Sequence, residues 1–195
     1  WPRGLEFDHR RGLLLVVDNF NDLVQVFSCD DDGGGSFVSK FGEHGTQPGQ
    51  LQYPFGIAID HDHDRILITD SANNRVQSWS LSEQSFLSCI GHRGSGDLEF
   101  NDPQGIAIDK HHRRIIIADT YNNRLVFLSS IDLSFLFCIG GKQGSQARDL
   151  GIASGVAIDD DRHRIIVSDT KNHRVQVLSS IDGSFLFEFG SEGNQ

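Results

Sequence analysis

The stretch from Pro103 to Gly140, PQGIAIDKHHRRIIIADTYNNRLVFLSSIDLSFLFCIG, decides the fold because the chain contains four copies of it. It holds four apolar runs, GIAID, RIIIAD, RLVFLS and SFLFCIG, which are separated by turn residues. Short runs rich in Ile, Val, Leu and Phe are typical of strands rather than helices. Each copy therefore predicts a meander of four antiparallel strands.

Three anchor positions mark the copies. A Pro-x-Gly triplet opens the first three, and the fourth opens with Ala153-Ser154-Gly155. An Asp ends the second apolar run of every copy, and a Gly closes the fourth run. The period is close to 50 residues, which is typical of propellers and solenoids. The anchors are Gly4, Gly56, Gly105 and Gly155; Asp18, Asp70, Asp119 and Asp169; and Gly42, Gly91, Gly140 and Gly190.

The predicted sheets are apolar on both sides, because neighbours such as Phe135 and Leu136 are both hydrophobic. A sheet of this kind needs a neighbour on each face, and radial stacking into a β-propeller provides one. We expect an all-β domain over residues 1–195. Its four-stranded antiparallel blades should span approximately 1–42, 54–91, 103–140 and 153–190.

The most specific part of the repeat is Asp-[Ser/Thr]-x-Asn-[Asn/His]-Arg-[Val/Leu], present as Asp70–Val76, Asp119–Leu125 and Asp169–Val175. This segment resembles the NHL repeat, and the resemblance covers almost the whole chain. The first copy departs from it, since Leu23 stands where the others have Arg. The resemblance implies a propeller of about six blades. We therefore expect these four blades to be part of a larger ring. An unusually small closed ring and completion by self-association are the alternatives.

Composition narrows the functional classes. The net charge is −10, which opposes general binding to nucleic acid, because that affinity depends on Lys and Arg neutralising phosphates. No apolar run approaches the ~20 residues that cross a bilayer, so we expect no membrane span. The three cysteines cannot all pair within one chain. We expect free thiols and a cytoplasmic, reducing compartment.

In a meander the turns alternate between the two ends of the blade. The second turns and the linkers between blades should share one end, here called the linker face, and the first and third turns should share the opposite face. Asp and Asn suit the second turns because their side chains bond nearby backbone N–H groups. We predict this turn-building role for Asp18, Asp70, Asp119, Asp169, Asn73, Asn122 and Asn172.

The linker face is also the predicted partner surface. Arg75, Arg124 and Arg174 recur once per blade, and they either pair with the turn Asp or present donors to a carboxylate or phosphate. Variation between blades on a repeated frame is where specificity would be encoded. The tentative contact residues are Arg75, Tyr121, Arg124, Lys171, His173 and Arg174.

The opposite face should carry the histidines of the first turns, and His61, His63, His111 and His112 form the densest groups. Imidazoles beside carboxylates are zinc ligands, but we expect the other blades to lie a blade-width away. Solvated turns are therefore preferred here, and neither a metal nor a cofactor is predicted. The third turn of the first copy carries the acidic, Gly-rich insertion of residues 30–35, in which three Asp precede three Gly. It lacks the spaced ligands and the terminal Glu of a calcium loop, so we expect a solvated turn there as well.

Three functions remain open. The resemblance favours a non-catalytic scaffold for a protein partner. Single-stranded RNA binding on the same face is the alternative, with Tyr121 for stacking and a set of cations, namely Arg93, Arg124, Lys142, Arg148, Lys171 and Arg174. A lyase or lactonase-like enzyme is disfavoured, because the first strands carry small residues and a single mid-strand acid, Glu6, in place of paired catalytic groups.

Overall fold

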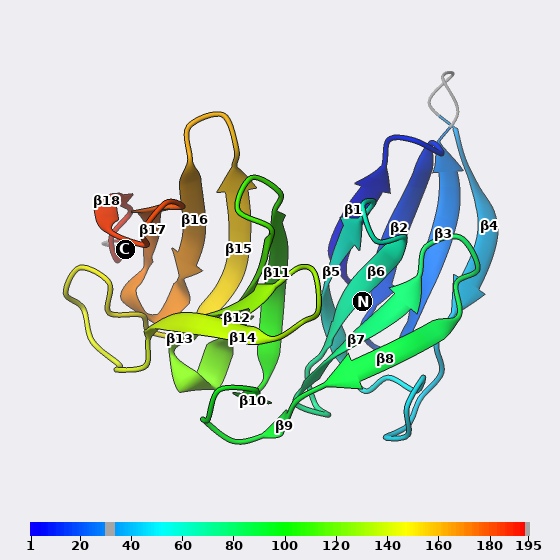
Figure 1. The fold of residues 1–195 in the computed structure, drawn as a ribbon, viewed down its shortest axis with the longest axis horizontal. Helices are drawn as coiled ribbons and strands as arrows, with labels where there is room; N and C mark the ends of the chain where they lie inside the picture. The colour runs from blue at the N-terminus through cyan, green and yellow to red at the C-terminus, as the bar shows by residue number, and fades with distance from the viewer. Residues whose placement is uncertain (30–33, 194–195) are drawn as a thin grey trace.

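The computed structural model describes residues 1–29 and 34–193, and it contains four four-stranded antiparallel sheets (Figure 1). Residues 30–33 of the predicted acidic turn lie outside the described residues. Blade 1 contains β1 (Pro2–Asp8), β2 (Leu13–Asp18), β3 (Leu23–Cys29) and β4 (Gly35–Phe41). Blade 2 contains β5 (Pro54–Asp60), β6 (Arg65–Asp70), β7 (Arg75–Ser80) and β8 (Phe86–Ile90). The predicted all-β propeller architecture is confirmed.

Blades 3 and 4 repeat the pattern. Blade 3 contains β11 (Pro103–Asp109), β12 (Arg114–Asp119), β13 (Arg124–Ser129) and β14 (Phe135–Gly140). Blade 4 contains β15 (Ala153–Asp159), β16 (Arg164–Asp169), β17 (Arg174–Ser179) and β18 (Phe185–Phe189). Short 3₁₀ helices, η1 (Thr120–Asn122) and η2 (Thr170–Asn172), form their second turns. The linker between blades 2 and 3 adds a small parallel pair, β9 (His92–Arg93) and β10 (Glu99–Phe100).

Left-handed residues close the tight turns. The second turns end on Asp22, Asn74, Asn123 and His173, which have φ of 57°, 54°, 54° and 53°. Asp and Asn tolerate this conformation better than most residues. The turn chemistry read from the sequence therefore acts through backbone geometry as well as through hydrogen bonds.

The first strands lie side by side around a common centre. Strand β5 lies between β1 and β11, and β11 also contacts β15. A Cβ atom on Gly105 would lie 2.7 Å from the carbonyl oxygen of Ser154 in the next blade, and one on Gly4 would lie 2.6 Å from that of Phe55. The Pro-x-Gly anchor thus marks the point where neighbouring inner strands approach too closely for any side chain.

Three hydrophobic layers separate the four blades. Blade 2 contributes Ile66 and Ile68 to the layer shared with blade 1, and Leu67 and Val76 to the layer shared with blade 3. Both faces of an inner blade are therefore buried, as the double-sided apolar pattern predicted. Each linker inserts one fully buried apolar side chain into its layer, namely Leu51, Phe100 and Leu150.

We predict that Gly105→Ala destabilises the fold by about 1–3 kcal/mol, because the new methyl group would overlap the Ser154 carbonyl of blade 4. Urea unfolding followed by circular dichroism would measure the change. Gly155→Ala is the matched control, since a Cβ there would meet the movable Ser168 hydroxyl rather than backbone. Equal losses in the two variants would contradict the close-approach explanation.

Candidate functional site

The two ends of the blades carry different loops, as predicted. On the linker face, each second turn is bonded to the linker that enters the same blade. The amides of Ala72, Tyr121 and Lys171 donate to the carbonyls of Gln52, Asn101 and Gly151. On the opposite face, first and third turns are joined, for example by the Ser130 amide and the Arg113 carbonyl. Any site on the linker face is therefore built from turn and linker together.

The arginine of blade 3 binds the linker from inside. Arg124 Nε donates to Asp119 Oδ2 at 2.7 Å. Its terminal nitrogens donate to the carbonyl oxygens of Ser95, Gly96 and Glu99, at 2.8, 2.7 and 2.8 Å. A planar guanidinium with five donors suits this divergent set of acceptors better than a Lys ammonium does. Arg124 is thus the hub that fixes the linker between blades 2 and 3.

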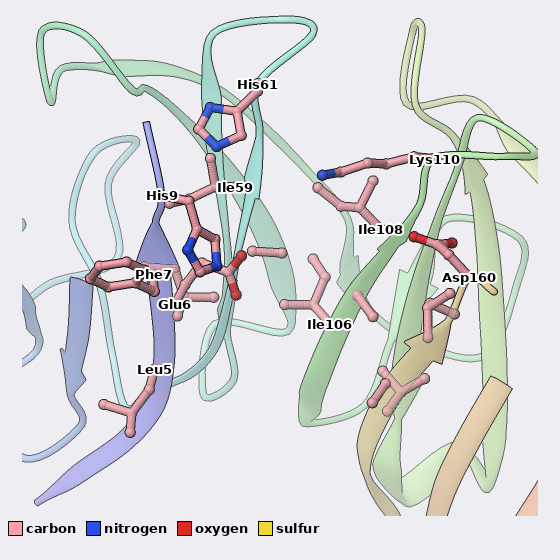
Figure 2. A pocket seen from close by; sticks show the side chains of 16 residues that line it. Leu5, Glu6, Phe7, His9, Ile59, His61, Ile106, Ile108, Lys110 and Asp160 are labelled. Atoms are coloured by element: carbon pink, nitrogen blue, oxygen red, sulfur yellow. The ribbon is translucent and has the colours of Figure 1, made fainter. Parts of the chain in front are cut away.

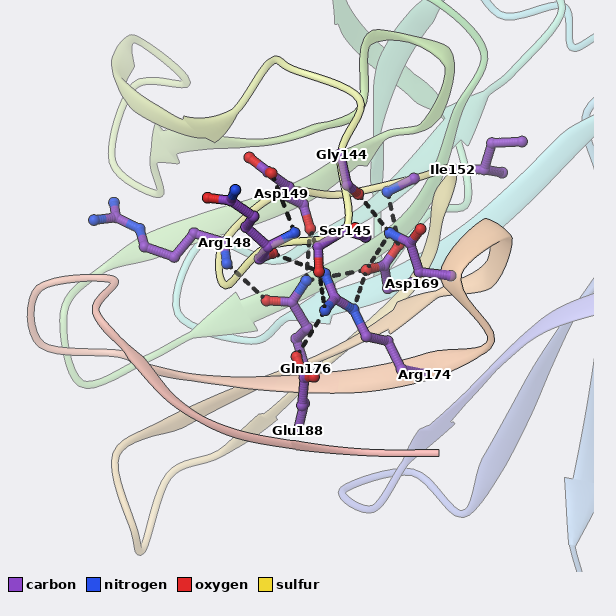
Figure 3. A network of polar contacts seen from close by, with 12 residues as sticks. Gly144, Ser145, Arg148, Asp149, Ile152, Asp169, Arg174, Gln176 and Glu188 are labelled. Atoms are coloured by element: carbon purple, nitrogen blue, oxygen red, sulfur yellow. Dashed lines mark hydrogen bonds and ion pairs between the residues drawn. The ribbon is translucent and has the colours of Figure 1, made fainter. Parts of the chain in front are cut away.

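Blades 2 and 4 contain the same arrangement, in which an Arg pairs with the turn Asp and donates to three linker carbonyls. We call this arrangement the clamp. Arg75 pairs with Asp70 at 2.7 Å and donates to the carbonyls of Thr46, Gln47 and Gln50. Figure 3 shows the blade 4 version, in which Arg174 contacts Asp169 and Glu188. Its linker acceptors are the carbonyls of Ser145, Gln146 and Asp149.

Each turn Asp has more partners than the sequence pattern indicated. Asp119 Oδ1 accepts the Asn101 amide of the linker at 2.7 Å, and Oδ2 accepts Asn122 at 2.8 Å. Asn122 also donates to the carbonyl of Gly94, so it joins turn and linker as well. Asp70 and Asp169 have equivalent bonds from Asn73 and Asn172. The residues predicted to build turns therefore also hold the linkers.

Blade 1 lacks this arginine and compensates in part. Asp18 accepts hydrogen bonds from Asn21 and Gln25, both at 2.8 Å, and from the amino group of Trp1. Burial opposes ionisation of Asp18, but these bonds outweigh it and lower the pKa of the carboxyl. The carboxylate stays satisfied although Leu23 replaces the Arg.

The clamp changes the interpretation of the predicted contact residues. The side chains of Arg75, Arg124 and Arg174 are buried, and the clamp bonds occupy their guanidinium groups. The pairing with the turn Asp is the alternative that the structure shows, so these arginines do not offer a ring of free donors. Tyr121, Lys171 and His173 are exposed at the surface of the second turns.

Aromatic residues that the sequence analysis did not single out also lie on the linker face. Phe20 occupies the same turn position as Tyr121, and their exposed fractions are 64% and 58%. Tyr53, 50% exposed, precedes blade 2 in a left-handed conformation with φ of 48°. The signal in the sequence was the variable third position of the Asp-[Ser/Thr]-x-Asn motif, which is Phe, Ala, Tyr and Lys in successive blades.

A second set of clamps lies on the opposite face. Arg65 and Arg114 begin the second strands of blades 2 and 3, pair with Asp60 and Asp109, and donate to the third-turn carbonyls of Ser130 and Ser180 in the next blade. In blade 1 Leu13 takes this place, and Arg11 from the turn donates to Leu81 O instead, at 2.6 Å. No role was predicted for these arginines, although an Arg stands at the start of the RIIIAD run.

The histidines of the first turns are closer together than expected. The ring centroids of His111 and His163, from blades 3 and 4, lie 5.0 Å apart, and that of His112 lies 5.9 and 6.3 Å from them. The expected blade-width separation is therefore wrong for this pair of blades, because the turns lean towards each other across the interface.

The inner strands of all four blades line a cavity of about 390 Å³ (Figure 2). Its lining combines aliphatic and charged side chains, with Ala58, Ala107 and Ala157 at the small-residue positions predicted for the axis. His9, His61, Lys110 and Asp160 surround one end of it. Burial raises the pKa of Glu6, which is the acid in the middle of β1.

Comparison with known proteins agrees with this architecture. Four-stranded antiparallel blades around shared inner strands define a β-propeller. A family described as a 6-bladed beta-propeller matches residues 7–92, and the NHL repeat family matches residues 100–126 and 150–178. Blades 3 and 4 therefore carry NHL repeats, which confirms the resemblance read from the sequence.

Solved structures show the same fold. A functionally unknown protein from Desulfotomaculum acetoxidans is 18% identical with a TM-score of 0.69, over 96% of this chain and 57% of that one. A streptogramin B lyase structure is 10% identical with a TM-score of 0.68, over 99% of this chain and 55% of that one. The chain thus spans somewhat more than half of each, and at these identities the likeness shows the fold alone. No curated protein sequence matches the chain.

Two further observations concern membrane-spanning segments and the state of the cysteines. No helix in the described ranges 1–29 and 34–193 has the length and apolar character needed to cross a membrane. All three cysteines, Cys29, Cys89 and Cys138, lie within those ranges and are free thiols.

We predict that Arg124→Ala lowers the free energy of unfolding by about 3–5 kcal/mol, because it leaves the Asp119 carboxylate buried without its counter-charge. Chemical denaturation would measure this loss, and hydrogen exchange should show faster exchange in the linker of residues 94–99. Arg93→Ala, an exposed change in the same linker, should stay within about 0.5 kcal/mol of the parent. The clamp would be disproved as a stabilising element if both variants unfolded alike.

Proposed function

We propose that this protein is a non-catalytic recognition module whose linker face binds a protein partner. The observation that carries the proposal is the group of exposed aromatic side chains, Phe20, Tyr53 and Tyr121, on a face whose backbone is fixed by buried clamps. Aromatic residues supply large contact areas at low entropic cost, and they dominate the energetics of many interfaces.

The rigidity of the face supports this function. Two of the three aromatic residues are held at their backbone: the Tyr53 amide donates to Asp22 Oδ1 at 2.6 Å, and the Tyr121 amide donates to Asn101 O at 3.1 Å. Little ordering entropy is then lost when a partner binds. Lys171 and His173 supply the polar periphery that protein interfaces generally have around an aromatic centre.

The charges of the linker face favour a protein over RNA. The exposed cations Arg93, Lys142 and Arg148 alternate along the linkers with acids such as Glu43 and Asp97. Arg75, Arg124 and Arg174 add little to the positive charge of this surface, because each is buried and paired with an Asp in a clamp. Single-stranded nucleic acid binds best to a continuous positive groove, so this alternation of charges supports a protein partner over RNA.

The proposal includes a reducing compartment such as the cytoplasm. Cys29 and Cys138 are exposed free thiols, and thiols persist where glutathione and thioredoxin keep them reduced. Labelling of a tagged chain in intact cells with a thiol reagent would test this placement directly.

The partner surface is testable without knowing the natural partner. Peptides selected from a displayed library against the parent protein should bind at least tenfold more weakly to the variant Phe20→Ser/Tyr53→Ser/Tyr121→Ser, because it loses the exposed aromatic area. Ile131→Ser/Ile181→Ser is the matched control, since both residues are exposed apolar groups in third turns on the opposite face. Fluorescence polarisation would measure the affinities.

Two outcomes would count against the proposal. Equal binding to the parent and the linker-face variant would remove the aromatic group as the contact surface. In a filter-binding titration at low salt, we expect no retention of mixed-sequence RNA. Retention that disappears in the Tyr53→Ser/Tyr121→Ser variant would instead assign the face to single-stranded RNA.

A further inference from the structure

Three histidines from two blades form a cluster on the face opposite the linkers. His111 and His112 lie in the turn between β11 and β12, and His163 lies in the turn between β15 and β16. Their ring centroids are 5.0, 5.9 and 6.3 Å apart. The cluster spans the boundary between blades 3 and 4, and the proposed partner surface does not use it.

The hydrogen bonds of His112 leave one nitrogen available. His112 Nδ1 lies 3.0 and 2.9 Å from the two carboxylate oxygens of Asp109. A carboxylate at this position holds the proton on Nδ1 and leaves the Nε2 lone pair free, as in the carboxylate–histidine arrangements that support metal ligands. Arg114 fixes Asp109 from its other side, so the orientation of the imidazole is built into the clamp.

The other two imidazoles are also unengaged. His163 Nδ1 is buried and has no hydrogen-bond partner, which is costly for a polar atom unless something else satisfies it. His111 is exposed, so its ring is free to rotate. The cluster therefore combines one oriented ring, one ring with an orphan nitrogen and one mobile ring.

The spacing of His111 and His163, 5.0 Å between ring centroids, suits a shared ion, and His112 lies 5.9 and 6.3 Å from them. Imidazoles that bind one tetrahedral metal at about 2.0–2.1 Å have centroids about 5 Å apart. In the present side-chain orientations no group of three His, Cys, Asp or Glu side chains converges on one point among the described residues. Convergence therefore requires the rings to turn, and His111, the most exposed of the three, has the most room to do so.

We propose that His111, His112 and His163 form an inter-blade site for a divalent transition metal such as Zn²⁺, Co²⁺ or Ni²⁺. Neutral imidazole prefers these borderline ions, whereas Ca²⁺ and Mg²⁺ prefer oxygen ligands. The bound ion satisfies the orphan nitrogen of His163 and ties the first turn of blade 3 to that of blade 4. A water molecule completes the coordination.

Titration of the untagged protein with Co²⁺ and Zn²⁺ tests the site. We expect the visible absorption bands of nitrogen-coordinated Co²⁺ to saturate at one ion per chain, and calorimetry to give the same stoichiometry for Zn²⁺. His111→Ala and His163→Ala should each weaken binding at least tenfold. Because imidazoles bind metals only when neutral, metal binding should release protons and the affinity should fall in acid.

His92→Ala, which removes an exposed imidazole from the linker face, is the control and should bind both ions as the parent does. The chain has nine histidines, so scattered surface binding is the competing result. It would appear as equal, modest losses in all three variants, and would overturn the proposal. So would the absence of saturable Co²⁺ binding in the parent. His111→Ala keeps the test decisive if His163→Ala fails to fold, because His111 is exposed.

Discussion

The structure depends on burying an aspartate at the end of every second strand without leaving its charge uncompensated. A buried carboxylate costs several kcal/mol unless a counter-charge and hydrogen bonds replace its water. Asp70 shows how this is done, with Arg75, Asn73, Gln77 and the Gln52 amide all donating to it. Once these donors are in place, the strand end, the turn and the linker can occupy only one arrangement. Linkers that lack regular structure over most of their length thereby become fixed parts of the fold.

Arginine suits this task because its donors diverge from one plane. A single guanidinium neutralises the Asp and also donates to three linker carbonyls, so it fixes the path of the linker against the turn. The opposite face repeats the principle with Arg65 and Arg114, whose acceptors belong to the next blade. The linker clamps therefore hold each blade to its entering chain, and the opposite clamps hold successive blades to each other. Blade 1 lacks both arginines. The Trp1 amino group supplies a positive charge to Asp18, and Arg11 donates to the next blade in place of the second Arg.

Most of the fold was predictable because the same pattern of strand and turn residues occurs four times in the chain. Double-sided apolar strands, turn residues and an even period all indicate stacked meanders, and the structure agrees. The partners of the repeated polar residues were harder to predict, since a repeated Arg fits an exposed binding ring and a buried clamp equally well at sequence level. The difference lies in contacts across about 28 residues, such as Arg75 with Gln47 O, which local patterns do not encode. The proximity of His111 to His163 could not be predicted for the same reason, because it depends on the relative position of two turns in different blades.

This distinction bears on where recognition is encoded in a repeat protein. A residue that recurs from blade to blade has the same role in each, and here that role is internal: glycines permit close inner strands, Asp and Asn build the turns, and the Arg of blades 2, 3 and 4 holds the linkers. Such residues are poor candidates for specificity, because exchanging them would disturb the frame. At the third position of the second turn the side chain has no such role. The turn uses only the backbone amide of Ala72, Tyr121 and Lys171, and the position is Phe20 in blade 1. A frame that is fixed by buried charge thus leaves a few exposed positions free to change, and selection for a partner can act on them without a cost in stability.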